Sequence, residues 1–517
     1  MPEIFSILVV CSYFLTIIIL SLFIKKRGLN AGHDFSTGGQ QFGWLAIGTS
    51  ILVSYISAMT FIGMPGWVYQ SGMQAMSMHM NYPIVIFFAA TIFVPIFYAL
   101  KVKSIYEYLE YRFGIYARTI NSVTFIIIQC ISSGVMLYAT SLIIIRILPI
   151  SITEAIIYIS MFTALYTCFG GMATVIFTDI LQSIVLLIGT VALIITLLLN
   201  IDSFSLVSAA SHLTVINLKM NLSDDTTLIS GVFAVSFLHL SVFGTNQLMI
   251  QRTLAAKNVD NAQKAMMVCG YGAFFVYLMF AFLGLLLFYF YGGKYFENSN
   301  EVILDYVFIH ATPAVFGIIL LALTSASMST LDSTYNSIAT VSTFDLYKRF
   351  IKPNEHSYHY EKVARALSPI SALLIVIPAL LSISNESVLK SIASMASIFV
   401  GIRLGSFLLG IFFENANEKG IIAGSVSSIL AVFYCQSTDI SWPWYAPIGT
   451  GSFILTGLLV SHFWGANSDA QRAFFYKQKR LLKRPKKSHY GLLVFFVFTQ
   501  ILSYFMPMIY EVLAAHG

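Results

Sequence analysis

Charged side chains are scarce in this chain of 517 residues. Asp, Glu, Lys and Arg make up 10% of the sequence, hydrophobic residues make up 57%, and the mean hydropathy is +0.80. These values exclude an ordinary soluble globular protein and indicate a polytopic membrane protein. The five cysteines stand apart in apolar stretches without the spacing of metal ligands, so we interpret them as packing residues.

Several sequence signals are missing as well. The first residues lack the basic region of a cleavable signal peptide, so we expect none. The phosphate-binding pattern G-x-x-x-x-G-K-[ST] is absent, which argues against ATP-driven pumping. The basic run KQKRLLKRPKK at 477–487 has no soluble domain beside it. We expect it to set topology and to attract anionic lipid head groups, and we expect no nucleic-acid partner.

Long apolar runs fill most of the chain. A helix that crosses the lipid bilayer needs about 20 apolar residues. By this criterion the sequence predicts fourteen transmembrane helices, at about 4–24, 44–65, 76–99, 119–146, 153–169, 174–200, 229–249, 264–292, 309–340, 366–383, 389–413, 420–437, 443–464 and 490–511.

The loops between these helices alternate in charge. If the amino terminus lies outside, the cytoplasmic loops hold 24 of the 29 Lys and Arg residues. Cytoplasmic loops of membrane proteins carry an excess of these residues. The sequence therefore predicts a multi-pass protein of the plasma (cell) membrane with the N-terminus and the C-terminus outside.

Polar residues interrupt the second predicted span, Trp44–Pro65. Two glycines flank those near mid-membrane depth, which are Ser50, Ser54, Tyr55, Ser57 and Thr60. Hydrocarbon cannot satisfy such groups, so the segment must line a cavity enclosed by protein. An interrupted helix also frees backbone carbonyls that hold a small cation or a solute. We predict that this segment forms half of a sodium-coupled transport site.

The ninth predicted span, 309–340, contains candidate cation ligands. Six hydroxyls and the carboxylate of Asp332 crowd into residues 325–334. Ala326, Ser329, Thr330 and Ser333 share one helical face. Hydroxyl and carboxylate oxygens suit a hard cation. Hydroxyl-mediated helix packing is the alternative, but it does not explain a carboxylate among six hydroxyls. We favour a cation site.

Four more ionisable residues lie within predicted spans, where such residues are costly and by default indicate function. Asp179 is either a cation-coupling group or a carboxylate solvated near the cytoplasmic end, and we favour coupling. His79 and His239 either contact a solute or are core histidines that hydrogen-bond across helices. Arg403 needs a partner, which is either a structural carboxylate or an anionic substrate.

Five stretches, in this order, resemble motifs of the sodium:solute symporter family: WLAIGTSILVSYISAMTFIGMPG (44–66), SIYEYLEYRFG (104–114), YTCFGGMATVIFTDILQ (166–182), TNQLMIQRTLAAK (245–257) and STLDSTYNSIATVSTFDLYKR (329–349). The resemblance implies an all-α fold with a LeuT-type core of two inverted five-helix repeats. It divides the chain into a leading helix (1–30), a first repeat (40–200), a second repeat (229–413) and C-terminal helices with a basic cytoplasmic loop (414–517).

The same resemblance implies a set of binding residues. In this family a sodium ion sits between the first broken helix and a later core helix, and the matching positions are the carbonyls of Val53, Ile56 and Ala326 and the hydroxyls of Ser329 and Thr330. Asp179 matches a carboxylate that serves sodium coupling. Asp332 and Ser333 match a second sodium site of some relatives, where an aspartate is a departure. The implied solute cavity comprises Tyr55, Ser57, Thr60, His79, Ser132 or Ser133, His239 and Phe243, with Arg403 as an additional cation.

Departures from the family pattern bear on the solute. Sugar-carrying relatives have an acidic residue at the position of His79, and sialic-acid relatives have an arginine at the position of Ser132. Arg403 replaces an apolar family position. We favour a small organic anion such as a monocarboxylate, vitamin or sialic acid, with a sugar or polyol as the alternative. The resemblance implies no cofactor apart from Na+ as the coupling ion.

Other classes of protein explain the residues less well. A membrane enzyme would use His79 and His239 as acid–base groups, but no nucleophile or metal cluster accompanies them in the sequence. A sensor would need an attached signalling domain, and a channel does not need interrupted helices around a solute-sized cavity. We therefore expect a symporter that works by alternating access, and no enzyme.

Overall fold

The structure is a computed structural model that describes residues 2–26, 34–145, 148–201, 210–383 and 398–516. Within these ranges the chain is helical, and the only strand-like pairing is an isolated bridge between Phe42 and Ala256. Short helices outside the predicted spans lie in the loops: η1 (Gly38–Gln40), α6 (Tyr106–Arg112), α9 (Ala210–Leu213), α13 (Glu301–Ile309) and α20 (Asp469–Leu481).

The helices of the predicted spans follow one another through the chain. Their bounds are α1 (Pro2–Lys26), α2 (Trp44–Tyr55), α3 (Ala58–Ser71), η2 (Gly72–His79), α4 (Tyr82–Phe88), η3 (Ala89–Phe93), α5 (Val94–Leu100), α7 (Ile115–Ile144), α8 (Ile152–Asn200), η5 (Ile229–Ala234), α10 (Val235–Thr245), α11 (Gln247–Leu254), α12 (Val259–Tyr291), α14 (Pro313–Val341), η6 (Ser342–Ile351), α15 (Ser357–Leu381), α17 (Val400–Phe412), α18 (Glu418–Gln436), α19 (Tyr445–Phe463) and α21 (Lys487–His516).

Length and hydropathy identify nine helices in the described residues that are able to cross a membrane, or ten if one bent pair forms a single span. Four shorter apolar helices add to them: Ser12–Ile24, Trp44–Tyr55, Ile152–Cys168 and Val400–Phe412. A break shortens two of these, Trp44–Tyr55 and Ile152–Cys168, below the length of a full span. The number fourteen therefore stays a prediction, whereas the all-α membrane fold is confirmed.

The structure defines the ends of several predicted spans. The spans 153–169 and 174–200 are the two helical parts of α8, which are separated by a kink at Gly171, where the backbone is not helical (φ 56°, ψ −152°) and glycine is favoured. His79 lies in the short helix η2, ahead of α4. The ninth span begins at Pro313 rather than at 309, because Thr312 caps α14 and proline is favoured in the first helical turn. Part of the span 389–413 lies outside the described residues.

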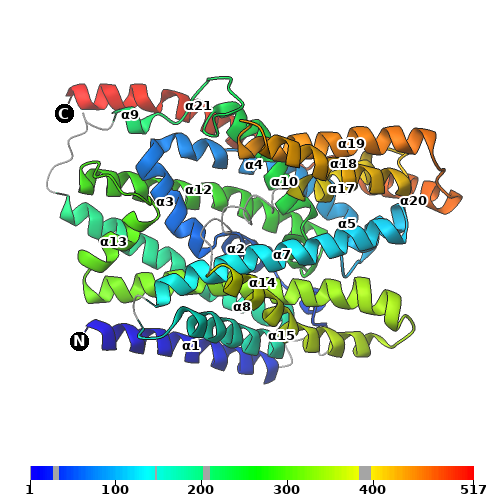
Figure 1. Cartoon of the computed structure of the whole chain (residues 1–517), viewed down its shortest axis with the longest axis horizontal. Coiled ribbons are helices and arrows are strands. Elements are labelled where there is room, and N and C mark those ends of the chain that lie inside the picture. Colours follow the sequence, from blue (N-terminus) through cyan, green and yellow to red (C-terminus); the bar gives the residue numbers. More distant parts are fainter. Residues whose placement is uncertain (1, 27–33, 146–147, 202–209, 384–397, 517) are drawn as a thin grey trace.

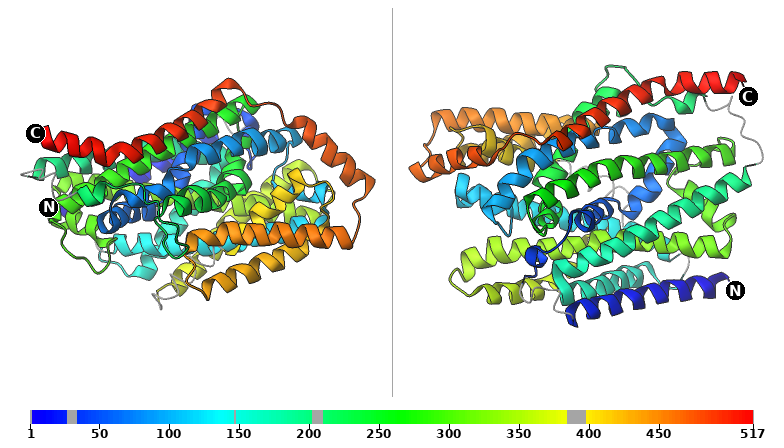
Figure 2. Two further views of the ribbon diagram at one scale, coloured as in Figure 1. Left: turned by 90° about the horizontal axis from the view of Figure 1, so that it is seen from above. Right: turned by 180° about the vertical axis from the view of Figure 1, so that it is seen from behind.

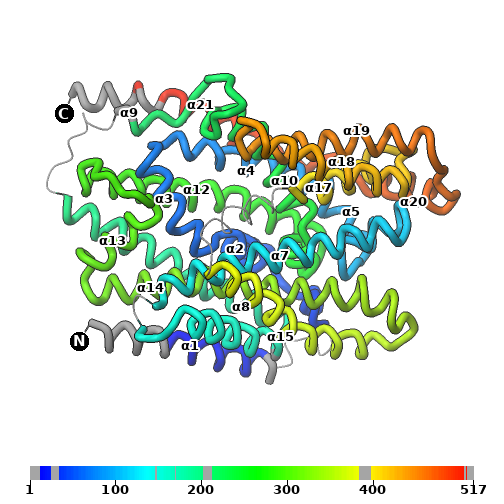
Figure 3. The backbone as a smooth tube through the Cα atoms, in the orientation of Figure 1, coloured from blue at the N-terminus to red at the C-terminus, as the bar shows by residue number. Residues whose placement is uncertain are grey.

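The long helices lie side by side, and Figure 1 marks both chain ends at the same end of the molecule. The helix α2 lies in the middle, between α12 and α14, and packs on both of them and on α8 (Figure 3). Two helices, α18 and α19, pair with each other beside α17, and α21 crosses the outside of α4 and α12 (Figure 2). This arrangement places Ser50 and Ser54 of α2, both buried, among three longer helices.

Each predicted repeat opens with a broken helix. The first break separates α2 from α3 at Ile56 and Ser57, and the second separates α10 from α11 at Asn246 with a bend of 44°. The LeuT-type core is confirmed by the solved structures described below. The residue boundaries of the two repeats stay a prediction.

Candidate functional site

The break between α2 and α3 has a clear local cause. Ile56 (φ −88°, ψ 102°) and Ser57 (φ −91°, ψ 169°) are both extended, and Ser57 Oγ caps α3 by accepting from the Thr60 amide at 3.3 Å. A helix that ends leaves the carbonyls of its last turn without amide donors. The carbonyls around Val53 are therefore available inside the molecule, where this residue and Ile56 are buried.

The break lies against the middle of α14. Thr330 Oγ1 is 3.3 Å from both the Ser54 carbonyl of α2 and the Ala326 carbonyl of its own helix. Ser329 Oγ is 3.4 Å from Ser54 Oγ. Two of the residues predicted to bind sodium, Ser329 and Thr330, thus contact Ser54, the neighbour of the predicted ligand Val53, although they lie about 276 residues apart in the chain. Oxygen atoms of carbonyls and hydroxyls are the ligands that a hard cation prefers.

Asp179 of α8 lies beside this cluster and is fully buried. Its carboxylate accepts hydrogen bonds from Ser329 Oγ at 2.5 Å, from Ser54 Oγ at 3.3 Å and from Ser50 Oγ. Three hydroxyls from two other helices therefore converge on one carboxylate. Asp179 does not lie at a solvated helix end, which was the alternative to a coupling role.

Arg252 of α11 also joins this cluster, and it is not among the predicted site residues. Its guanidinium is fully buried, lies 3.4 Å from the Asp179 carboxylate, and donates from Nε to Ser50 Oγ at 2.9 Å. It also donates to Ser333 Oγ and to the Leu248 carbonyl. We had counted Arg252 as a cytoplasmic loop cation because it follows a predicted span. Its place in the 245–257 motif was the signal available in the sequence.

Asp332 and Ser333 face different neighbours. Ser333 Oγ lies 3.3 Å from Ser54 Oγ and therefore joins the Asp179 cluster. The Asp332 carboxylate instead accepts from Tyr166 at 2.8 Å and from Ser333 at 3.0 Å, with Thr178 at 3.4 Å. Within the part of the chain that the structure describes, no cationic side chain lies within 4.0 Å of Asp332.

The predicted solute residues form an aromatic cluster next to the break. The Tyr55 ring is 4.8 Å from Phe243 and 6.0 Å from His239 between ring centroids. Tyr82 donates to the Tyr55 hydroxyl at 3.1 Å and lies 2.7 Å from His79 Nδ1. This cluster combines apolar ring faces with hydrogen-bonding tips, which suits a small organic solute.

Two more side chains, Tyr277 and Asn81, contact this cluster. Tyr277 of α12 stacks on His79 with ring centroids 3.8 Å apart. His239 donates from Nδ1 to Asn81 Oδ1 at 2.6 Å, and Asn81 in turn donates to the Gly231 carbonyl at 2.8 Å. Both histidines thus have partners across helices. The aromatic residues Tyr82 and Tyr277 were not singled out in the sequence, because nothing distinguishes them from other tyrosines in apolar runs.

The remaining predicted solute residues lie elsewhere. Ser133 Oγ faces α14 and is 3.1 Å from Thr334 Oγ1, while Ser132 is half-buried on the same helix α7. Arg403 of α17 is buried and donates from Nε to Ser241 Oγ at 2.7 Å. Ser241 is two residues from His239, about 200° around α10, so it faces away from the aromatic cluster. No carboxylate lies within 4.0 Å of Arg403 in the described ranges.

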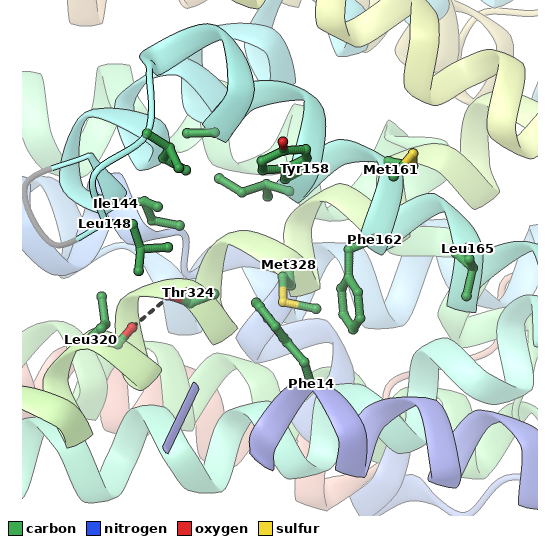
Figure 4. A pocket seen from close by; sticks show the side chains of 13 residues that line it. Phe14, Ile144, Leu148, Tyr158, Met161, Phe162, Leu165, Leu320, Thr324 and Met328 are labelled. Carbon is green, nitrogen blue, oxygen red and sulfur yellow. Dashed lines mark hydrogen bonds between the residues drawn. The ribbon is translucent and has the colours of Figure 1, made fainter. Parts of the chain in front are cut away.

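An apolar cavity of about 380 Å³ lies on the other side of α14 (Figure 4). Phe14, Phe162 and Met328 line it, and none of its lining side chains is charged. Its rim includes Met161 and Leu165, which are exposed on the apolar outside of α8. The cavity has no groups that would orient a polar solute, so it is not the candidate solute site.

Broken helices that meet around buried oxygen atoms are typical of membrane transporters. The similarity of the chain to known proteins supports the same class. The chain shares the fold of a solved Na+-coupled sialic acid symporter in a substrate-bound outward-open state. The TM-score is 0.83 and the identity 22%, over 90% of this chain and 99% of that chain. The chain belongs to the sodium:solute symporter family, whose pattern it matches over residues 35–427.

Two curated relatives show the range of this family. The chain is 29% identical to the sodium/sialic acid symporter NanT of Aliivibrio fischeri, over 87% of this chain and 91% of that protein. It is 27% identical to a sodium/glucose cotransporter of Vibrio parahaemolyticus, over 85% of this chain and 86% of that protein. Membership establishes a sodium-coupled symporter in a membrane, with Na+ as the coupling ion.

Proposed function

We propose that this symporter imports a small organic anion together with sodium, and that the ion binds between the α2 break and α14. The observation that carries the proposal is the approach of Thr330 Oγ1 and Ser329 Oγ to the end of α2. In this proposal the sodium ligands are the carbonyls of Val53, Ile56 and Ala326 and the hydroxyls of Ser329 and Thr330. The alternative solute is a sugar or a polyol.

Asp179 is the proposed coupling residue, together with Asp332 and Ser333. Ser329 donates its proton to Asp179 at 2.5 Å, which turns the free lone pairs of its oxygen away from the carboxylate. Those lone pairs are available to a cation held at the α2 break. A change at the ion is therefore transmitted to Asp179 and, through the carboxylate, to Arg252 of α11 at 3.4 Å.

Sodium binding drives transport in this proposal because it favours one conformation over the other. A ligand shifts such an equilibrium only by its difference in affinity for the two states. Each positive charge that moves through the membrane potential gains about 2.3 kcal/mol per 100 mV. That energy is enough to concentrate a solute about 50-fold at this potential.

The solute is proposed to bind at the aromatic cluster, with Tyr55, His79, His239 and Phe243 as contacts and with Ser57 and Thr60 at the start of α3. Ser132, Ser133 and Arg403 are the proposed outer contacts. Arg403 favours an anion because it is a buried cation without a carboxylate partner in the described ranges. A buried charge needs a partner. The hydroxyl tips of the cluster would serve a sugar equally well.

Uptake into proteoliposomes tests this function. Purified protein should accumulate a radiolabelled solute under an inward sodium gradient, and replacing sodium with choline should abolish the accumulation. A panel of monocarboxylates, vitamins, sialic acids and sugars, each offered at one concentration, would identify the solute class. Saturable uptake that does not depend on sodium, across the whole panel, would overturn the proposed sodium site.

We further propose that the protein resides in the plasma membrane with both termini outside, and that it has no enzymatic activity. Support for the orientation comes from the basic loops, which alternate along the chain. Support for the second statement comes from the family, which consists of transporters.

A further inference from the structure

A second cavity, which is polar and has a volume of about 580 Å³, lies away from the transport site. Its walls come from three parts of the chain: the end of α5 around Tyr98, the start of α12 around Asp260, and the segment that joins α20 to α21. Figure 1 places α20 at the opposite end of the molecule from the two chain ends. By the proposed orientation this is the cytoplasmic side of the membrane.

The cavity is lined by an excess of positive charge. Four cationic side chains and one carboxylate belong to its lining. Lys486 and Asp260 neutralise each other at 2.7 Å. The other three cations are Arg480, Lys483 and Arg484, which are exposed and form no ion pair within the residues that the structure describes.

The walls behind these cations are fixed by hydrogen bonds. Tyr98 donates to the Ala256 carbonyl at 2.9 Å, and Gln263 donates to the Ala90 carbonyl at 2.9 Å. His489 is buried and accepts from the Lys486 amide at 3.1 Å. The cavity is therefore a formed recess with three unpaired cations at its mouth, not only a solvated basic stretch.

An apolar surface continues from the cavity along α21. Tyr490, Val494 and Phe498 follow one another at intervals of four residues on one helical face and are exposed. The Tyr490 ring also contacts Phe87 of α4, 5.8 Å between centroids, and Phe88 beside it is exposed. A ligand bound here meets positive charge at one end and apolar surface at the other.

We propose that this cavity binds the head group of an anionic glycerophospholipid, whose acyl chains lie on the exposed face of α21 and α4. Basic pockets between membrane helices on the cytoplasmic side suit such head groups. The phosphate supplies the negative charge that pairs with the three cations. The exposed apolar face of α21 and α4 favours a lipid over a soluble phosphate. The site joins α5, α12 and α21, and it does not depend on which solute the symporter carries.

Native mass spectrometry in a neutral detergent tests the proposal without a charged membrane surface. The probe is phosphatidylglycerol, offered in competition with phosphatidylcholine. The test variant is Arg480→Gln/Lys483→Gln/Arg484→Gln, and the control is Arg472→Gln/Lys477→Gln/Lys487→Gln, which removes three charges outside the cavity. We expect wild type and control to retain phosphatidylglycerol, and the cavity variant to bind it about 100-fold more weakly, at about fivefold per charge.

Three results would overturn the proposal. One is equal loss of phosphatidylglycerol from the cavity variant and the control, and another is no preference over phosphatidylcholine in wild type. The third is displacement of the lipid by millimolar inorganic phosphate, which would indicate a soluble anion. Because the three cations are exposed, we expect the cavity variant to fold, and the single variant Arg484→Gln, with about fivefold weaker binding, provides an intermediate.

Discussion

At the scale of single residues, the centre of the molecule is organised by one buried ion pair. Arg252 and Asp179 share Ser50 as a hydrogen-bond partner, so charge and hydroxyls form one connected cluster. Breaking a buried pair leaves an uncompensated charge, which typically costs about 3–5 kcal/mol. The pair therefore supports the geometry on which the proposed ion site depends.

The ion pair predicts that the effects of substituting Arg252 and Asp179 on the free energy of unfolding are not additive. Arg252→Met should lower the free energy of unfolding by about 3 kcal/mol, because it leaves Asp179 buried without a cation. Adding Asp179→Asn should restore part of that loss. Thermal unfolding of the single and double variants in detergent measures the coupling, with Arg252→Lys as the charge-preserving control. Strictly additive losses would show that the two residues act independently.

Arg403 gives a prediction about the solute. Arg403→Met should reduce uptake of an anionic solute about tenfold or more, because a hydrogen bond to a charged group is worth about 1.5–3 kcal/mol. A neutral solute should be affected little. Ser241→Ala is the matched control, since it removes the 2.7 Å contact to Nε and keeps the charge. Equal loss for both solutes would make Arg403 a structural residue.

The sequence indicated which residues belong to this site more reliably than the directions in which their side chains point. The hydroxyls of Ser329 and Thr330 and the break at Ile56 and Ser57 were identifiable, since polar groups inside an apolar run must be enclosed. Asp332 was grouped with them, but its position on α14 turns it toward Tyr166. Arg252 was missed because basic residues near a span end also mark topology. The side of a helix that faces a given neighbour depends on how the helices pack, and this packing cannot be read from the sequence.

At the scale of elements, a short segment ahead of α2 contacts helices of both predicted repeats. Residues 34–42 contact three helices and one loop: the Phe35 carbonyl accepts from the Met172 amide of α8 at 2.9 Å, and the Ser36 carbonyl accepts from Gln251 of α11 at 2.8 Å. The Phe35 amide donates to Glu361 of α15, and Asp34 pairs with Lys103 at 2.7 Å. We expect this segment to respond when the inner side opens.

The ion pair of Asp34 predicts a pH dependence. Burial raises the pKa of the Asp34 carboxyl, but Lys103 and the donors of Thr37 outweigh it, so the pKa is lowered overall. A lowered pKa adds stability above the unfolded value of about 3.9, and this stability is lost as the pH falls through the folded value. Asp34→Asn should therefore lower the melting temperature at pH 7, and the difference from wild type should shrink below about pH 4. A difference that is constant with pH would contradict the assignment.

Some elements were not predictable from hydropathy. The kink that joins the two predicted spans within α8 depends on Gly171, where an added Cβ would lie 2.8 Å from the Phe35 carbonyl. The helices α6, α13 and α20 are too short or too polar to register as spans. In contrast, the break at Ile56 was predicted from serine, threonine and glycine within an apolar run, whereas the break at Asn246 was not predicted. Polarity inside a span was the reliable signal, whereas the exact ends of helices were not.

At the scale of the whole molecule, sodium-driven import requires a defined orientation in the membrane. The loop residue Met220 is highly exposed on the predicted outer side, and Lys477 is exposed on α20 at the other end. A membrane-impermeant thiol reagent added to intact cells should label Met220→Cys and leave Lys477→Cys unlabelled until the cells are permeabilised. Wild type supplies the background of its own cysteines. Labelling of Lys477→Cys alone in intact cells would reverse the orientation.

The most direct test of the account is sodium binding by purified protein, measured with radioactive sodium in a scintillation proximity assay. Ser329→Ala/Thr330→Ala should raise the half-saturating sodium concentration about tenfold or more, because two oxygen ligands are lost. Ser325→Ala/Ser337→Ala removes two buried hydroxyls of α14 that have no hydrogen-bond partner in the described residues, and it should change little. Unchanged sodium affinity in the first variant would contradict an ion between the α2 break and α14.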